Sequence, residues 1–211
     1  MMAVTERMLQ AEAALRAEAD RLMASGLLDV LTSYGSVHVV GSYMMRLMAW
    51  RDLDIHLVPD TMDRRTFFTL GGRIASLLSA KRMHYRDEVG GGESRLPDGL
   101  YWGVYLGDER KGAWKIDIWA TRPEGLDRVR RYCEAIVERL TESRRVTILT
   151  IKSDCWAHPE YRRSFSSEDI YTAVLDHGVE DVGEFWRYLE KRAGRRIGTG
   201  GATGAIPEGS R

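Results

Sequence analysis

Two short segments that alternate apolar and acidic residues constrain this chain most. Asp52 and Asp54 alternate with large apolar residues in segment 51–58, and Asp117 lies between two isoleucines in segment 114–119. A period of two is typical of β-strands with one buried face. Residues i and i+2 of a strand point to the same side. The sequence therefore predicts a sheet on which Asp52 and Asp54 project side by side.

Carboxylates this close repel one another unless a cation lies between them. Divalent ions such as Mg²⁺ prefer carboxylate oxygens as ligands. If the Asp117 strand pairs alongside the first acidic strand, three carboxylates converge and suit two-metal phosphoryl or nucleotidyl transfer. Asp-x-Asp alone is more often a solvated strand face than a metal site, so the interpretation depends on the combination with Asp117.

The apolar pattern before residue 125 predicts a mixed arrangement of helices and strands. Three- and four-residue spacing predicts helices over about 5–31, 43–50 and 63–80. Alternation predicts strands over 37–40 and 82–89, and a hairpin formed by 100–106 and 113–120. We expect an α+β fold: a small mixed sheet with helices on one face, followed by a C-terminal helical region.

The helix predicted over 63–80 carries further signals. Asp60 or Asp63 can cap its first turn. The pair Gly71-Gly72 weakens its middle by roughly 1 kcal/mol per glycine relative to alanine. Its expected buried side consists of Phe67, Leu70, Ile74, Leu77 and Leu78.

From residue 126 onward the pattern becomes helical. Segment 144–156 is ambiguous, because its β-branched residues favour a strand while its neighbours are helical; we favour a helix. Ser166 and Asp169 form a capping pair for a helix over 167–177, and a last helix is expected over 183–193. The run Gly90–Gly92 predicts a flexible link, and glycine-rich residues 194–211 predict a disordered tail.

These patterns predict a domain organisation in three parts. Residues 1–124 form the sheet-containing core with its N-terminal helix, residues 125–193 form the helical region, and 194–211 form the tail.

Composition excludes some classes of protein. The 211 residues carry 31 basic and 31 acidic side chains, and this neutral balance argues against a large non-specific nucleic-acid surface. The two cysteines are too few for a disulfide scaffold, so a cytoplasmic location is the expectation. No secretory signal is visible, and no apolar run approaches the length that spans a bilayer.

The order of motifs resembles the polymerase-β-type nucleotidyltransferase superfamily. Its pattern has a strand ending in Gly-Ser, a short helix, a strand with Asp-x-Asp and a later strand with a third acid. Segments 39–42, 52–55 and 115–118 match that pattern in order and spacing. The resemblance covers about residues 35–120 and implies a small nucleotidyltransferase-like protein.

The resemblance also implies roles for particular residues. Asp52 and Asp54 hold two Mg²⁺ ions, and Asp117 binds the catalytic ion and helps to deprotonate the attacking hydroxyl. Gly41 lets a phosphate approach the backbone, and Ser42 donates hydrogen bonds to it. Without the aspartates, Gly41-Ser42 would be read as an ordinary turn with a serine cap.

Four other residues have two readings each. Lys152 resembles a helical lysine that contacts the triphosphate, or it is a surface lysine. Lys115 shares a strand face with Asp117 and either steadies the carboxylates and phosphate or forms a simple charge pair. His56 is a fourth metal ligand or, more commonly, a hydrogen-bonded strand histidine. Arg46 could reach a γ-phosphate, but a solvent-facing arginine is the favoured reading.

The aromatic residues of the predicted hairpin are read as cross-strand packing, although one ring could stack on a nucleobase. They are Tyr101, Trp102, Tyr105, Trp114 and Trp119.

The predicted function is Mg²⁺-dependent transfer of a nucleoside monophosphate from an NTP, with ATP as the expected donor. The motif does not identify the acceptor, which is a small molecule, a protein or an RNA. The alternative is a catalytically silent nucleotide-binding or regulatory module with the same fold. Either way, the cleft is expected between the sheet and the helical region.

Overall fold

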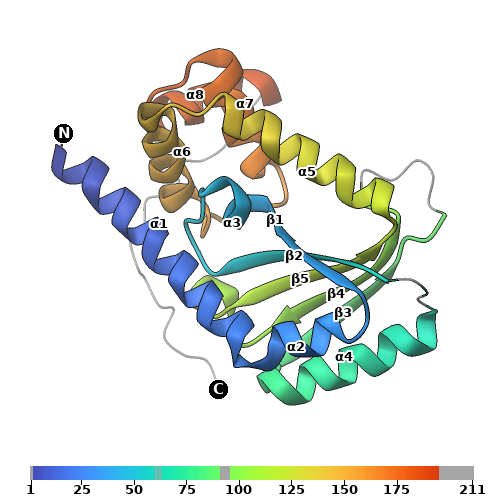
Figure 1. The fold of residues 1–211 in the computed structure, drawn as a ribbon. Helices are drawn as coiled ribbons and strands as arrows, with labels where there is room; N and C mark the ends of the chain where they lie inside the picture. Colours follow the sequence, from blue (N-terminus) through green and yellow to red (C-terminus); the bar gives the residue numbers. More distant parts are fainter. Residues whose placement is uncertain (1, 60, 62, 91–95, 195–211) are drawn as a thin grey trace, which may run out of the picture.

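The computed structural model describes residues 2–59, 61, 63–90 and 96–194 (Figure 1). The strands are β1 (Ser36–Val40), β2 (Asp52–Val58), β3 (Arg82–Asp87), β4 (Gly99–Tyr105) and β5 (Lys115–Thr121). The α-helices are α1 (Met2–Leu22), α2 (Leu28–Thr32), α3 (Gly41–Met45), α4 (Arg64–Leu78), α5 (Pro123–Glu138), α6 (Glu142–Cys155), α7 (Ser167–His177) and α8 (Val182–Ala193). A π-helical turn (Met23–Leu27) links α1 to α2, and a 3₁₀ turn (Glu109–Lys111) lies between β4 and β5.

The strands form one mixed sheet in the order β1-β2-β5-β4-β3. β2 and β5 pair in parallel, whereas the other neighbouring pairs are antiparallel. The predicted α+β class is therefore confirmed, as is the hairpin of β4 and β5. The parallel pairing places the two acidic strands side by side at the centre of the sheet.

One face of the sheet carries the first hydrophobic core. Leu53, Ile55 and Leu57 of β2 point to this face together with alternate residues of β4 and β5. Helices α1, α2 and α4 cover it (Figure 1), and Phe67 of α4 and Leu31 of α2 are fully buried there. Because every second residue of β2 faces this core, Asp52 and Asp54 must point to the opposite face.

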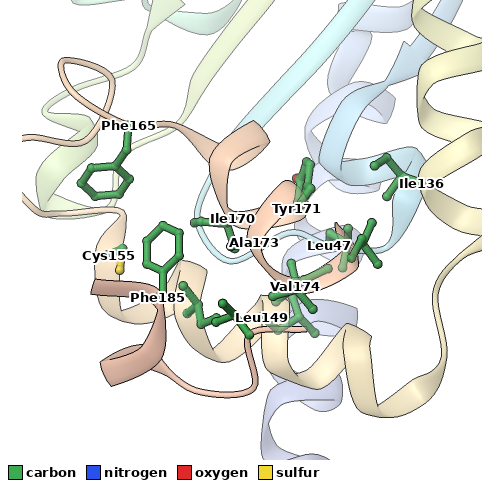
Figure 2. Close-up of a cluster of buried hydrophobic side chains, with 14 of the residues drawn as sticks. Leu47, Ile136, Leu149, Cys155, Phe165, Ile170, Tyr171, Ala173, Val174 and Phe185 are labelled. Carbon is green, nitrogen blue, oxygen red and sulfur yellow. The ribbon is translucent and has the colours of Figure 1, made fainter. Parts of the chain in front are cut away.

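A second hydrophobic core lies within the C-terminal helices (Figure 2). Phe165, Ile170 and Phe185 meet there with residues of α6. Leu47, from the segment after α3, packs into the same cluster, so this core also holds the chain that leads into β2. The predicted division at residue 124 stays a prediction.

Segment 144–156 is helical, as expected. Thr141 caps α6 by accepting a hydrogen bond from the Arg144 amide, and Ile148 and Ile151 are buried three residues apart. Burial on one helical face therefore outweighs the β-propensity of the segment. The predicted caps of α4 and α7 are also present: Asp63 accepts from the Thr66 amide, and Ser166 forms a capping box with Asp169.

Three local expectations were wrong. The helix predicted over 5–31 is interrupted at Gly26, whose φ of +104° lies outside the helical region. The helix predicted over 43–50 ends at Met45, because Arg46 adopts a left-handed conformation with φ of 55°. Leu77 is 40% exposed, not buried, and Leu78 is the residue of the last turn of α4 that packs against the core.

Some predictions fall outside the described residues. They concern the possible cap at Asp60, the residues Gly91 and Gly92, and positions 195–211 of the predicted tail. Among the helices that are described, none is both long and apolar enough to cross a membrane.

The adjacent glycines of α4 provide a matched pair for testing the packing of this helix. A Cβ at Gly71 would lie 2.6 Å from Cε2 of Trp102, whereas a Cβ at Gly72 meets nothing within 4 Å. We expect Gly72→Ala to raise the free energy of unfolding by about 0.5–1 kcal/mol, because alanine is the better helix former. We expect Gly71→Ala to lower it by about 1–3 kcal/mol, because the methyl group overpacks the core. Urea denaturation of both variants measures this, and equal effects would contradict the packing described here.

Candidate functional site

The parallel pairing of β2 with β5 brings the three aspartates together. Asp54 lies directly opposite Asp117 in the register, and Asp52 lies opposite Lys115. Neighbouring strands are about 4.8 Å apart, so these side chains project from adjacent positions on one face. The expected convergence of the carboxylates is therefore present, on the face that α1, α2 and α4 leave uncovered.

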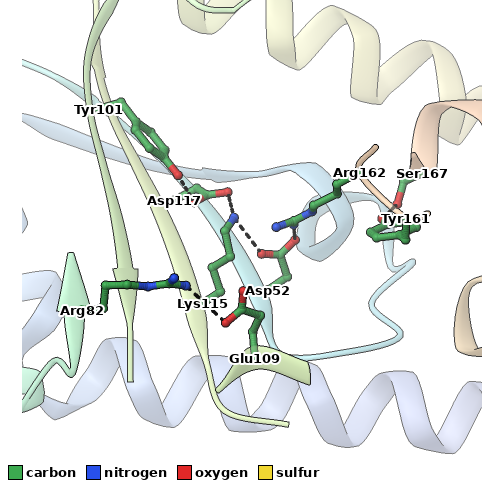
Figure 3. A network of polar contacts seen from close by, with 9 residues as sticks. All are labelled: Asp52, Arg82, Tyr101, Glu109, Lys115, Asp117, Tyr161, Arg162 and Ser167. Atoms are coloured by element: carbon green, nitrogen blue, oxygen red, sulfur yellow. Dashed lines mark hydrogen bonds and ion pairs between the residues drawn. The ribbon is translucent and has the colours of Figure 1, made fainter. Parts of the chain in front are cut away.

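Two cationic side chains lie among the carboxylates (Figure 3). The Lys115 ammonium donates to Asp117 Oδ2 and lies 3.4 Å from Asp52 Oδ1. Arg162, from the segment between α6 and α7, donates to Asp52 Oδ2 at 2.6 Å. Lys115 is only 5% exposed. These contacts support the reading in which Lys115 steadies the carboxylates.

The cations make the carboxylates electrostatically unequal. Burial opposes ionisation of Asp52, but Lys115 and Arg162 together hold its pKa below the ordinary value. Burial, together with the charges of Asp52 and Asp117, raises the pKa of Asp54 to about 7. Within the described part of the chain, Asp54 makes no hydrogen bond or ion pair through its side chain. Asp54 is therefore the carboxylate that most lacks a cation.

Asp117 is held from a second side by Tyr101 of β4. The Tyr101 hydroxyl donates to Asp117 Oδ1 at 2.6 Å. Burial and the Asp117 charge raise the pKa of Tyr101, so its hydroxyl remains a donor. Gly103 pairs with Asp117 in the register, and a Cβ there would lie 2.5 Å from the Tyr101 hydroxyl. A glycine at this position therefore leaves room for the tyrosine to reach Asp117.

Gly41 and Ser42 lie at the start of α3, directly after β1. Gly41 has φ of +61°, and a Cβ there would lie 2.2 Å from Asp54 Oδ2. Both the left-handed backbone and the closeness of the carboxylate require glycine at this position. The reading of Gly41-Ser42 as an ordinary turn does not account for this contact.

Lys152 is a buried residue of α6 with 1% exposure, so its reading as a surface lysine is wrong. Its ammonium donates to the Leu47 carbonyl at 2.7 Å and to the Tyr171 hydroxyl at 3.1 Å. It also lies 4.8 Å from the centroid of the Trp50 ring. Burial lowers the pKa of Lys152 to about 8, and Asp52 and Asp54 oppose that shift.

A cavity of about 520 Å³ lies between the sheet and the C-terminal helices, where the cleft was expected. Five of the six predicted site residues line it, namely Gly41, Ser42, Asp52, Asp54 and Lys152. Asp117 is not among the lining residues, and its two oxygens are held by Tyr101 and Lys115.

The structure adds residues that sequence reasoning missed. Arg162 and Tyr161 line the cavity from the segment after α6, and Tyr171 lines it from α7. The aromatic reading of Tyr101 as packing was incomplete: its ring packs on Trp119, with centroids 4.7 Å apart, while its hydroxyl holds Asp117. Arg162 precedes another arginine in an irregular segment, and no periodicity there indicates which cation turns inward.

Two alternatives are resolved in favour of the simpler reading. His56 is 3% exposed, and its Nδ1 lies 3.2 Å from the Thr121 hydroxyl, as expected for a hydrogen-bonded strand histidine. Burial lowers the pKa of His56 to about 4. Arg46 is exposed and does not line the cavity that holds the aspartates.

The carboxylate oxygens are the kind of ligand that Mg²⁺ prefers, although the three side chains do not surround a common point. Among the described residues, no three His, Cys, Asp or Glu side chains are grouped closely enough to hold a metal. Lys115 lies where its ammonium contacts both Asp52 and Asp117, so a cation binding both must share or displace it. The unpaired Asp54, with its raised pKa, has the character of a ligand that lacks its cation. On this ground, the chemistry of Asp54 fits the ion, although the present spacing of the three carboxylates does not form a metal site.

No protein-family model and no curated protein matches the sequence. Two solved structures are similar to it at low identity. One is described as the structural basis for the activity of a cytoplasmic RNA terminal U-transferase: it is 11% identical, with a TM-score of 0.49, over 85% of this chain and 55% of that chain. The other is a CdnC:HORMA-deltaN complex from E. coli MS115-1: it is 15% identical, with a TM-score of 0.45, over 90% of this chain and 70% of that chain.

This chain spans little more than half the length of the first of these structures. Similarity at this level carries no information about activity. The order β1, α3, β2 and β5, with its motifs on one face of the sheet, is the order that the resemblance to polymerase-β-type nucleotidyltransferases implied. The resemblance is confirmed for the fold.

The pKa values of Asp52 and Asp54 are shifted in opposite directions, so replacing each by asparagine should have opposite effects on stability. Asp54→Asn removes a charge that burial and its neighbours disfavour, so it should stabilise the metal-free protein by on the order of 2 kcal/mol at pH 8. That free energy is smaller than the one that corresponds to the full pKa shift, because Asp54 is only half-buried and solvent screens its charge. The gain should largely disappear near pH 4, because the folded carboxyl is then protonated and the unfolded one, with an ordinary pKa of 3.8, is only partly ionised.

Asp52→Asn removes the partner of Lys115 and Arg162, so it should destabilise the protein by about 1–3 kcal/mol. Thermal melts of both variants in EDTA at pH 4 to 8 provide the measurement. A less stable Asp54→Asn variant would mean that Asp54 is a structural hydrogen-bond acceptor.

The pKa of Lys152 predicts a pH dependence in the alkaline range. Its folded-state pKa of about 8 lies below the ordinary 10.5, so the unfolded chain binds more protons between these values. The stability of the wild type relative to Lys152→Met should therefore rise by about 1–3 kcal/mol from pH 8 to pH 10.5. Urea denaturation of both proteins across this range tests it. A constant difference would show that Lys152 titrates normally.

Proposed function

We propose that this protein transfers a nucleoside monophosphate from an NTP to an acceptor group. The observation that carries the proposal is the unpaired Asp54 carboxylate, flanked by Asp52 and Asp117 and bordering a 520 Å³ cavity. A structural cluster would have each carboxylate neutralised, as Asp52 and Asp117 are. A carboxylate left without its cation beside two others indicates a place for a cationic ligand, and Mg²⁺ suits these oxygens.

In this proposal, Asp52, Asp54 and Asp117 would hold two Mg²⁺ ions, which would supply positive charge for the reacting phosphate and the departing pyrophosphate. Asp117 accepts the proton of the attacking hydroxyl, and Tyr101 keeps that carboxylate in one orientation through its hydrogen bond. Lys115 contacts both Asp52 and Asp117 through its ammonium, and its charge acts to lower the pKa of Asp52 in the free protein.

The remaining lining residues bind the nucleotide. Ser42 lies next to Gly41, which contacts Asp54, so its hydroxyl is placed to donate to a phosphate near the ions. Lys152 and Arg162 supply positive charge on the opposite wall, which suits a triphosphate. Trp50 and Tyr161 also line the cavity, and their rings pack on each other with centroids 5.2 Å apart. ATP as the donor, the identity of the acceptor and a cytoplasmic location stay predictions.

Labelling with α-³²P-NTPs tests the proposal. Purified protein is incubated with each NTP, Mg²⁺ and cell extract, and labelled products are separated by size and by protease and nuclease sensitivity. We expect label transfer that falls at least a hundredfold in Asp54→Asn. Asp127→Asn, an exposed change on α5, provides the control and should label as the wild type does. Equal labelling by wild type and Asp54→Asn would contradict the proposal.

A catalytically silent nucleotide-binding module is the second candidate. It is favoured by the contacts of Lys115 and Arg162, which stabilise Asp52 and Asp117 without any metal. Calorimetric titration with ATP, followed by a pyrophosphate assay, separates the candidates. Mg²⁺-dependent binding with pyrophosphate release supports the enzyme, and metal-independent binding without release supports the module.

A further inference from the structure

A second cavity, of about 570 Å³, lies between α1 and α6. It shares no lining residue with the cavity that holds Asp52 and Asp54. Its walls come from one side of α1, from the first turn of α6 and from Arg46 at the end of α3. The predicted function makes no use of this space.

Three arginines converge on this second cavity: Arg16, Arg46 and Arg145. The Nη1 of Arg145 donates to the carbonyls of Met45 and Arg46, both at 2.8 Å. Arg46 is exposed, and the described residues give its guanidinium no hydrogen-bond or ion-pair partner. The Arg16 Nε is buried and has no hydrogen-bond partner in the described structure. The cavity therefore offers several unused N–H donors.

Glu12 lies one helical turn before Arg16 and is 7% exposed. Its Oε1 is buried without a hydrogen-bond partner among the described residues. Burial raises the pKa of Glu12, even though Arg16, Arg145 and Arg46 act to lower it. An unpartnered buried carboxyl oxygen costs free energy. A ligand that brings its own hydrogen-bond groups removes that cost.

The other acids of the cavity leave the arginines available. Asp20 already accepts the Tyr43 hydroxyl at 2.6 Å, and Glu142 is an exposed residue at the start of α6. No salt bridge joins Arg16, Arg46 or Arg145 to an acid within the described residues. Guanidinium groups recognise phosphate oxygens through paired, charge-assisted hydrogen bonds.

We infer that this second cavity binds a small phosphorylated molecule, its phosphate held by Arg16, Arg46 and Arg145 and a hydroxyl or amino group held by Glu12. The volume of about 570 Å³ is of the size that encloses small-molecule ligands. The site does not depend on nucleotidyl transfer, because its residues are separate from those of the carboxylate cluster.

Residues of the α3 segment line both cavities, with Met45 in the first and Arg46, directly after the helix, in the second. Gly41 and Ser42 at its start line the first cavity, and the carbonyls of Met45 and Arg46 at its end are held by Arg145. Both bonds come from Nη1 of Arg145, so the other N–H groups of its guanidinium can engage a phosphate without releasing those carbonyls.

Calorimetric titration in EDTA tests the inference, because chelation removes the divalent ions that a nucleotide at the carboxylate cluster requires. The probes are inorganic pyrophosphate, ribose 5-phosphate and AMP, which share the phosphate and differ in what it carries. We expect at least one probe to bind at a single site, and the affinity to fall at least tenfold in the double variant Arg16→Gln/Arg46→Gln. Arg145 is left intact, since it holds the end of α3.

Two controls make the result specific. Arg21→Gln changes an exposed arginine in the last turn of α1, and Lys152→Met changes the first cavity; both should bind the probe as the wild type does. Far-UV circular dichroism and thermal melts confirm that the double variant is folded. The inference is overturned if no probe binds, if the double variant binds normally, or if only Lys152→Met loses binding. The probe that binds most tightly shows whether the site prefers a second phosphate, a ribose or a nucleoside next to the bound phosphate.

Discussion

Compensation of charge on one face of the sheet is the constraint on which the rest of this structure depends. The parallel pairing of β2 with β5 places Asp54 opposite Asp117, with Asp52 beside them. Lys115 contacts two of these carboxylates from the same face, and Arg162 contacts Asp52 from the C-terminal region. Three acids can share this space because two cations lie among them. Asp54 remains without one, and the proposed function follows from that asymmetry.

The same electrostatics join the sheet to the helical region. Arg162 crosses to Asp52, and the Lys152 ammonium is held by the Leu47 carbonyl next to the sheet. Arg110, between β4 and β5, donates to the carbonyl of Ala157 at 2.8 Å, just after α6. Arginine and lysine side chains thus cross the boundary on both sides of the cavity. Both these polar contacts and the second hydrophobic core hold the helices over the carboxylates.

Much of this arrangement follows from the sequence, because period-two alternation fixes which side of a strand each residue faces. That rule alone predicted that Asp52 and Asp54 are neighbours and that Lys115 shares a face with Asp117. It could not predict Arg162, since this residue lies in an irregular segment without periodicity, where its backbone is left-handed (φ of 65°). The burial of Lys152 did have a local signal, because the residues three and four positions away on its helical face are all apolar: Ile148, Leu149, Cys155 and Trp156. Long-range pairing of charges is a property of the folded chain and not of a local pattern.

Equilibrium binding of Mn²⁺, followed by electron paramagnetic resonance, tests the central claim most directly, since Mn²⁺ takes the same oxygen ligands as Mg²⁺. The wild type should bind Mn²⁺ saturably in the presence of a non-hydrolysable NTP analogue. Asp54→Asn should lose at least tenfold in affinity while remaining folded, and Lys115→Gln should retain binding. Wild-type and Asp54→Asn proteins that bind Mn²⁺ equally, or a wild type that binds none, would contradict the assignment of these carboxylates to a metal-dependent site.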